Sequence, residues 1–139
     1  MSGAIVTERT YHAPIESVWL AITTPDAIKH WFFDLPGFKA EVGAEFRFYG
    51  GKDENNQYLH ICVVTEVVPG KKLTYSWRYD GYAGISYVSF ELFSEGNQTR
   101  LKFTHDGIET FPQNNPDFAR ENFAEGWTYT VDALKGFVE

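Results

Sequence analysis

Hydrophobic and polar residues alternate along the middle of the chain, and this alternation predicts antiparallel strands with one buried face. In the clearest case, apolar side chains fall on every second position of the segment 73–79, with polar side chains between them. Similar runs are separated by turn signals such as Pro69-Gly70 and Asp80-Gly81, and residues 50–56 predict a polar turn. The predicted strands are Ile5–Tyr11, Phe46–Tyr49, Tyr58–Val68, Leu73–Tyr79, Ile85–Phe93 and Arg100–Asp106.

Two short helices are predicted between the first and second strands. Pro14 fits the first position of a helix, where its missing N–H costs nothing. Thr24 and Pro25 then form a second start signal, a capping residue followed by proline. We expect the second helix to end before Pro36-Gly37. The apolar positions are Ile15, Val18, Trp19 and Ile22 in the first helix, and Ile28, Trp31 and Phe32 in the second.

A long amphipathic helix is predicted at the C-terminal end of the chain. Asn115 and Pro116 form its start signal. Gly126 interrupts the helix and should cost about 1 kcal/mol relative to alanine. Either the helix proper begins near Gly126, or another element packs close to it. The apolar stripe is Phe123, Trp127, Val131, Leu134 and Val138.

Together these elements predict an α+β fold in one domain that spans residues 1–139. An antiparallel meander must cover its apolar face, and the C-terminal helix is the long amphipathic element available to cover it. Sheets of this size twist and coil. A coiled sheet closed by one helix, with the short helix pair at one edge, can leave a cavity inside.

The inward-facing residues of these elements predict the walls of that cavity. They include rings that either pack as a simple core or bind an apolar or aromatic molecule. His105 shares the inward phase, and it either contacts a ligand or is a core histidine satisfied by one hydrogen bond. Arg47 and Arg78 have the outward phase. The candidate ligand-binding residues are Trp31, Phe46, Phe48, Tyr75, Trp77, Tyr79, Phe90, Phe103, His105 and Trp127.

Composition narrows the classes of partner. Aromatic residues make up 17% of the 139 residues, which favours a ring-walled interior. The net charge of −7 disfavours nucleic acid and anionic lipid as partners. No apolar run approaches the roughly 20 residues of a membrane helix, so no membrane insertion is expected. The single cysteine, Cys62, and the lack of a signal-peptide pattern predict a cytoplasmic protein.

No motif in the sequence supports a catalytic residue, a metal or a cofactor. His60 and Cys62 are two residues apart on a predicted strand, so they share a face and could bind a soft metal together, but a third ligand is not evident. The alternative is an ordinary pair facing the core or solvent. The Gly50-Gly51 segment lacks the ending of a phosphate-binding loop, and a hairpin turn explains it.

Several landmarks occur in a recognisable order along the chain. They are Ala13–Thr23 running to Trp31-Phe32, Val64–Pro69, Leu73–Trp77, Phe103–Gly107, Gly126-Trp127 and Leu134-Lys135. In this order they resemble the activator-of-heat-shock-protein-90-ATPase homologue family, which belongs to the START-like (SRPBCC, Bet v 1-like) superfamily. The resemblance implies a helix-grip fold, a curved sheet wrapped around a C-terminal helix, with an internal hydrophobic cavity.

Three functional hypotheses follow from the residues and the resemblance. The leading one is a module that binds a small hydrophobic or aromatic molecule without catalysis. The first alternative is a cyclase- or hydrolase-like enzyme that uses the same cavity, with His105 as its titratable group. The second alternative, which rests on the resemblance alone, is a chaperone-associated protein. The chaperone activator itself carries an additional N-terminal domain for which this chain has no room. A homodimer through a sheet face or edge is also open.

Overall fold

The computed structural model describes residues 3–51 and 54–139. Lys52 and Asp53, within the predicted polar turn, lie outside the described residues. In chain order the elements are β1 (Ile5–Tyr11), α1 (Ile15–Thr23), α2 (Pro25–Ile28), β2 (Glu45–Gly51), β3 (Gln57–Val68), β4 (Lys72–Tyr79), β5 (Ser86–Glu95), β6 (Gln98–Asp106), the 3-10 turns η1 (Ile108–Thr110) and η2 (Pro116–Phe118), and α3 (Arg120–Val138).

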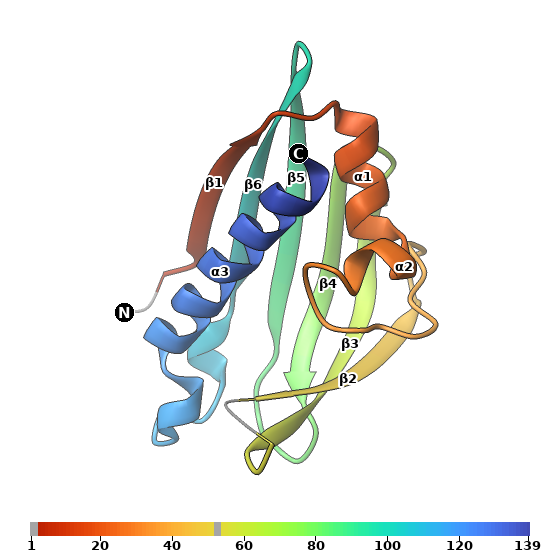
Figure 1. The fold of residues 1–139 in the computed structure, drawn as a ribbon. Coiled ribbons are helices and arrows are strands. Elements are labelled where there is room, and N and C mark those ends of the chain that lie inside the picture. The colour runs from red at the N-terminus through yellow and green to blue at the C-terminus, as the bar shows by residue number, and fades with distance from the viewer. Residues whose placement is uncertain (1–2, 52–53) are drawn as a thin grey trace.

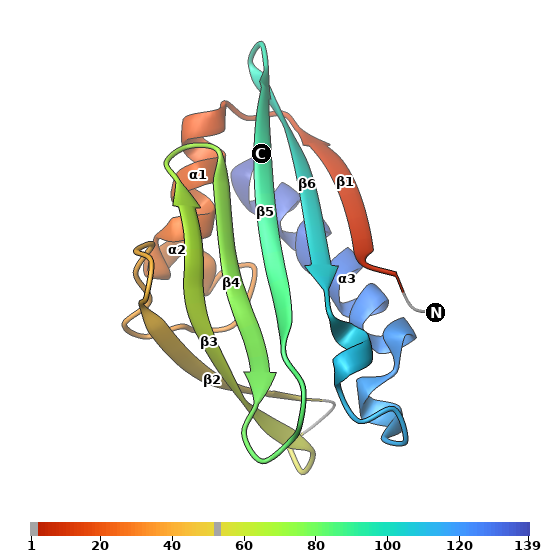
Figure 2. The same cartoon turned by 180° about the vertical axis from the view of Figure 1, so that it is seen from behind.

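The strands in the described part of the chain form one six-stranded antiparallel sheet in the order β1-β6-β5-β4-β3-β2. Strands β2 to β6 follow one another as a meander, and β1 joins the far edge beside β6. Helix α3 runs across one face of the sheet, while α1 and α2 lie beside it over β3 and β4 (Figure 1). Seen from behind, the strands lie in front of all the helices (Figure 2). This confirms the predicted α+β helix-grip arrangement.

The faces of β4 show how the alternation works and where it is incomplete. Tyr75, Trp77 and Tyr79 are buried toward the helices, and Arg78 is exposed as predicted. Ser76 has the outward phase yet is buried. It lies on a central strand, and its hydroxyl is 3.1 Å from the Val63 backbone N–H, which donates to it. A small side chain on a central strand is covered by its neighbours even on the outer face.

The short helix pair differs from the prediction in its boundaries. Pro14 precedes α1 as its capping residue rather than opening it. Helix α2 ends at Ile28, so Trp31 and Phe32 lie in the turn that follows, not on the helix as predicted. The physical reason is a tertiary contact, because the Trp31 indole N–H donates to the Ala21 carbonyl of α1 at 3.0 Å and the buried ring is held there.

Where the sequence predicts the start of one C-terminal helix, the structure has the 3-10 turn η2 followed by the separate helix α3. The Asn115 side chain accepts a hydrogen bond from the Asp117 N–H, but this cap opens only η2. Ala119 then adopts an extended conformation, and α3 begins at Arg120. Both interpretations of Gly126 are wrong. The helix starts before it and continues through it, and a Cβ atom at Gly126 would meet no atom within 4 Å.

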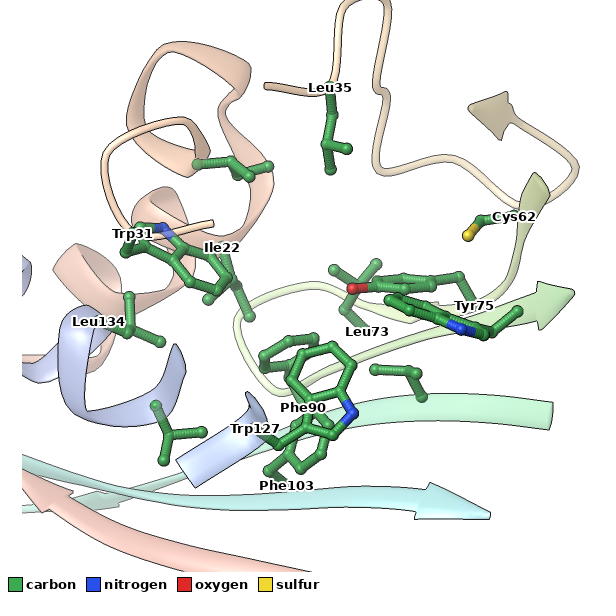
Figure 3. Close-up of a cluster of buried hydrophobic side chains, with 14 of the residues drawn as sticks. Ile22, Trp31, Leu35, Cys62, Leu73, Tyr75, Phe90, Phe103, Trp127 and Leu134 are labelled. Atoms are coloured by element: carbon green, nitrogen blue, oxygen red, sulfur yellow. The ribbon is translucent and has the colours of Figure 1, made fainter. Parts of the chain in front are cut away.

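The hydrophobic core fills the space between α3, α1 and the sheet. Trp127 and Phe103 point toward each other in Figure 3, and Leu134 of α3 lies near Ile22 of α1. The Tyr11 hydroxyl anchors β1 to the helix by donating to the Val131 carbonyl at 2.8 Å. Among the described residues, no helix is long and apolar enough to cross a membrane. The packed core occupies only part of the inner face, which leaves room for the site described next.

Candidate ligand-binding cavity

A cavity of about 930 Å³ lies beside the packed core. Its walls come from the loop after α2, from β2, β3 and β4 of the sheet, and from η2 and α3. We call this space the aromatic cavity. It is lined by His30, Trp31, Phe32, Phe33, Gly50, Gly51, Tyr58, His60, Trp77, Tyr79, Pro116, Asp117, Phe118, Ala119, Asn122, Phe123, Gly126, Trp127, Tyr129, Thr130 and Ala133.

The helix wall of the aromatic cavity combines aromatic side chains with a row of small ones. Gly126, Thr130 and Ala133 follow one another at i, i+4 and i+7 on α3, so they lie on one face of the helix. The Thr130 hydroxyl donates to the Gly126 carbonyl at 2.8 Å, which holds this side chain against its own helix. Because these side chains are short, the space that larger side chains would occupy stays open.

The sheet wall consists of rings from β3 and β4. The buried Trp77 indole N–H donates to the Tyr79 hydroxyl at 2.9 Å. Tyr58 closes the end of this wall, and its hydroxyl donates to the Asp117 carboxylate of η2 at 2.5 Å. That hydrogen bond is the main reason why the pKa of Tyr58 is raised. The bond joins β3 to η2, two segments far apart in the sequence, across the edge of the cavity.

His60 is a titratable side chain on the cavity wall. Its ring stacks on Phe48 with a centroid distance of 4.4 Å, and its Nδ1 lies 3.0 Å from the Tyr58 carbonyl oxygen. Since a carbonyl can only accept, Nδ1 carries the proton in this contact. Burial lowers the pKa of His60 to about 4, although hydrogen bonding to the backbone of Tyr58 and Phe48 acts in the opposite direction. His60 is therefore neutral at neutral pH.

His105 lies behind the wall in a fully buried hydrogen-bonded chain. The Trp127 indole N–H donates to Nδ1 of His105 at 2.9 Å, so the ring proton resides on Nε2. Nε2 then donates to the Ser86 hydroxyl at 2.7 Å, and Ser86 donates to the Trp77 carbonyl. Burial lowers the pKa of His105 to about 3. Both ring nitrogens are occupied, so His105 orients the Trp127 ring that forms part of the cavity wall.

Comparison with known families explains this arrangement. Residues 12–139 match the model of the family described as activator of Hsp90 ATPase homolog 1-like proteins. This chain belongs to that family. Membership confirms the resemblance carried by the sequence landmarks, and the sheet gripping α3 is the helix-grip arrangement of the START-like superfamily.

Solved structures of other family-like proteins share the fold. Protein BH1534 from Bacillus halodurans is 28% identical, with 99% of this chain and 98% of that chain covered and a TM-score of 0.76. MLL2253 from Mesorhizobium loti is 26% identical, with coverages of 96% and 95% and a TM-score of 0.76. CalU16 from Micromonospora echinospora is 26% identical, with coverages of 98% and 76% and a TM-score of 0.75. No curated protein sequence matches the chain.

The predicted ligand-binding residues fall into two groups in this family member. Alternation identified the inner face correctly, but α1 and the segment after α2 cover part of that face. Residues there pack against one another: Phe46, for example, contacts Phe38 and Tyr75 edge to face. Trp31, Trp77, Tyr79 and Trp127 line the aromatic cavity. Phe46, Phe48, Tyr75, Phe90, Phe103 and His105 are buried outside the lining.

Several lining residues were missing from the prediction. Tyr58 and His60 share the phase of buried Cys62 on β3, so the alternation of that strand could have found them. Gly126 carried a signal too, as an unexplained glycine in a helix. By contrast, Phe33 lies outside the helices and strands, and Phe118 lies in the single turn η2. Neither segment is long enough for a periodic pattern to indicate an inner face.

The two residues of the hypothetical metal pair are both buried, His60 at the cavity wall and Cys62 in the core. His60 and Cys62 are both buried, at 6% and 0% exposure. Burial raises the pKa of the Cys62 thiol, which disfavours the thiolate that a metal would need. Within residues 3–51 and 54–139, no group of three or more His, Cys, Asp and Glu side chains could hold a metal ion.

Proposed function

We propose that this protein binds a small hydrophobic or aromatic molecule in the aromatic cavity and does not transform it. One observation carries the proposal: a space of about 930 Å³ is walled by aromatic rings from both the sheet and the helix, and a row of small residues on the helix leaves it open. Cavities of several hundred Å³ with mostly apolar walls and few polar groups are typical of small-molecule sites.

The aromatic cavity suits flat apolar molecules in particular. The rings of Trp77 and Trp127 lie 5.4 Å apart and are inclined by 61°, and Phe32 stacks on Trp127 at 5.6 Å. Aromatic rings offer large flat surfaces that are already fixed in place, so a ligand that stacks on them loses little conformational freedom. A ring-bearing ligand gains more from such walls than a flexible chain of the same area.

The states of His60 and His105 support binding without catalysis. His60 is neutral at the wall, and both nitrogens of His105 are occupied by Trp127 and Ser86. General acid–base catalysis needs a group whose pKa lies near the working pH and which reaches the reacting atom. The pKa values of about 4 and about 3 place both histidines far from that condition.

Filling the cavity from the helix side tests this function. Gly126 lines the cavity, and a Cβ atom there would meet no atom within 4 Å. Gly126→Leu therefore adds a branched side chain at an open position of the cavity wall. Gly136→Leu is the matched control, because Gly136 lies on the same helix, outside the lining, with no atom within 4 Å of its Cβ position.

A panel of neutral polycyclic aromatics and apolar lipids would be titrated against each protein. Trp31, Trp77 and Trp127 line the cavity, so their fluorescence reports occupancy directly. We expect binding by the wild type and by Gly136→Leu, and a loss of at least about ten-fold in affinity for Gly126→Leu. Equal affinities of the two variants, or no binding by the wild type, would refute the proposed function.

We also propose the cytoplasm as the location of the protein. The support is the single cysteine, Cys62, which is a fully buried free thiol and fits a reducing compartment. Fractionation of the native host tests this directly, and recovery of the protein outside the cytoplasm contradicts it.

A further inference from the structure

The Tyr79 hydroxyl has an unused hydrogen at the wall of the aromatic cavity. Tyr79 is 5% exposed, and its oxygen accepts the Trp77 indole N–H at 2.9 Å. A phenol has one hydrogen, and in this contact the oxygen serves as the acceptor, so that hydrogen must point elsewhere. No side chain or backbone group among the described residues accepts it. Burial raises the pKa of Tyr79, so the hydroxyl keeps its hydrogen at neutral pH.

The side chains packed around Tyr79 are aromatic rings, and among the three nearest only the imidazole of His60 carries polar atoms. His60 lies 4.7 Å away and Phe118 4.9 Å away between ring centroids, and Phe111 lies at 5.1 Å. In such surroundings an unpaired donor is costly, and a ligand oxygen that reaches it gains a hydrogen bond in a low-dielectric site. The Trp77 N–H polarises the hydroxyl by donating to it, which strengthens its own donation.

The charges around the cavity decide which kind of oxygen fits. The described lining contains no Lys or Arg, and its acidic side chain is that of Asp117. An anionic ligand would lose its hydration without gaining a Lys or Arg partner among the described lining residues, and Asp117 would repel it. A neutral carbonyl or ether oxygen satisfies the Tyr79 donor without that cost.

We propose that the Tyr79 hydroxyl, held by Trp77, is a recognition subsite for an uncharged hydrogen-bond-accepting oxygen on a ring-bearing ligand. This inference rests on the proposed function, since it names the class of molecule that the aromatic cavity takes: neutral aromatic ketones, quinones and ethers rather than fatty acids or plain hydrocarbons. A ligand of this class stacks on the cavity rings and directs its oxygen toward β4.

A matched set of three ligands tests the subsite. Fluorenone and fluorene have nearly the same flat shape and differ by one carbonyl oxygen, and fluorene carboxylate adds a negative charge. Titrations followed by tryptophan fluorescence and by calorimetry should show that the wild type binds fluorenone about ten-fold more tightly than fluorene, with the carboxylate weakest.

The Tyr79→Phe variant removes the hydroxyl and keeps the ring. We expect the preference for fluorenone over fluorene to fall to about one in this variant, while fluorene affinity changes little. Tyr49→Phe is the control, because Tyr49 is 65% exposed and lies outside the lining. It should keep the wild-type preference.

The outcomes separate the subsite from the proposed function. Equal binding of fluorenone and fluorene by the wild type overturns the subsite while leaving a hydrophobic binding function intact. A preference that survives in Tyr79→Phe, or tighter binding of the carboxylate, also overturns it. If no ligand binds, both proposals fall. Equal binding of the two ligands by the wild type overturns the subsite even if loss of the Trp77 partner prevents Tyr79→Phe from folding.

Discussion

Mild acid should destabilise this protein strongly, because folding buries two neutral histidines. The pKa of His60 is about 4 and that of His105 about 3 in the folded protein, and both values are lowered by burial. In the unfolded chain a histidine titrates near pH 6.5. Between these values the unfolded chain binds more protons than the folded one, so the free energy of unfolding falls as pH decreases below about 6.5.

The size of the effect follows from the width of that window. At pH 5 each histidine is almost fully protonated in the unfolded chain and largely neutral in the folded one. One pKa unit corresponds to about 1.4 kcal/mol, so each histidine removes about 2 kcal/mol between pH 7 and pH 5. The two together remove about 4 kcal/mol, a large share of the stability of a small domain.

Urea unfolding at pH 7, 6 and 5 measures this loss, and non-titrating variants assign it. In His105→Gln, the amide can still accept from Trp127 and donate to Ser86, and in His60→Asn it can still donate to the Tyr58 carbonyl. Each variant should remove about 2 kcal/mol of the pH-dependent loss.

Two results would refute the reasoning. The first is a free energy of unfolding that stays constant between pH 7 and pH 5. The second is a full pH-dependent loss in the double variant of His60 and His105, since the protons would then bind elsewhere. Carboxylates titrate mainly below this window, so they do not obscure the comparison.

Three further substitutions test the packing around the aromatic cavity. Gly126→Ala should stabilise the protein by about 1 kcal/mol in urea unfolding, because its Cβ meets no atom and alanine favours the helix; a destabilised variant contradicts this. Trp127→Phe leaves Nδ1 of His105 without its donor and should cost about 1–3 kcal/mol, read as a lower melting temperature; an unchanged Tm excludes the hydrogen-bonded chain. Tyr58→Phe removes the partly exposed bond to Asp117 and should cost about 1 kcal/mol and speed amide exchange in η2; exchange at the wild-type rate refutes the link.

Local patterns account for most of the architecture. The alternation of β4 predicted which residues face inward, because successive side chains of a strand point to opposite sides whatever surrounds them. Arg78 is exposed and Tyr79 buried as that rule requires. Boundaries were less accurate where a distant contact intervenes. Helix α2 stops before Trp31 because that indole bonds to α1, and no local signal marks such a contact.

Periodicity within single segments was enough to predict the inner face, the antiparallel order of the meander and the presence of a covering helix. Which part of the inner face stays open depends instead on tertiary packing. His105 and His60 both face inward, yet His105 is enclosed with Trp127 and Ser86, whereas His60 borders the cavity. Strand phase specifies a side of the sheet, but the place where α3 and the short helices leave it uncovered depends on how separate elements pack. The role of a small residue such as Gly126, which leaves the cavity open, is likewise visible only in the packed structure.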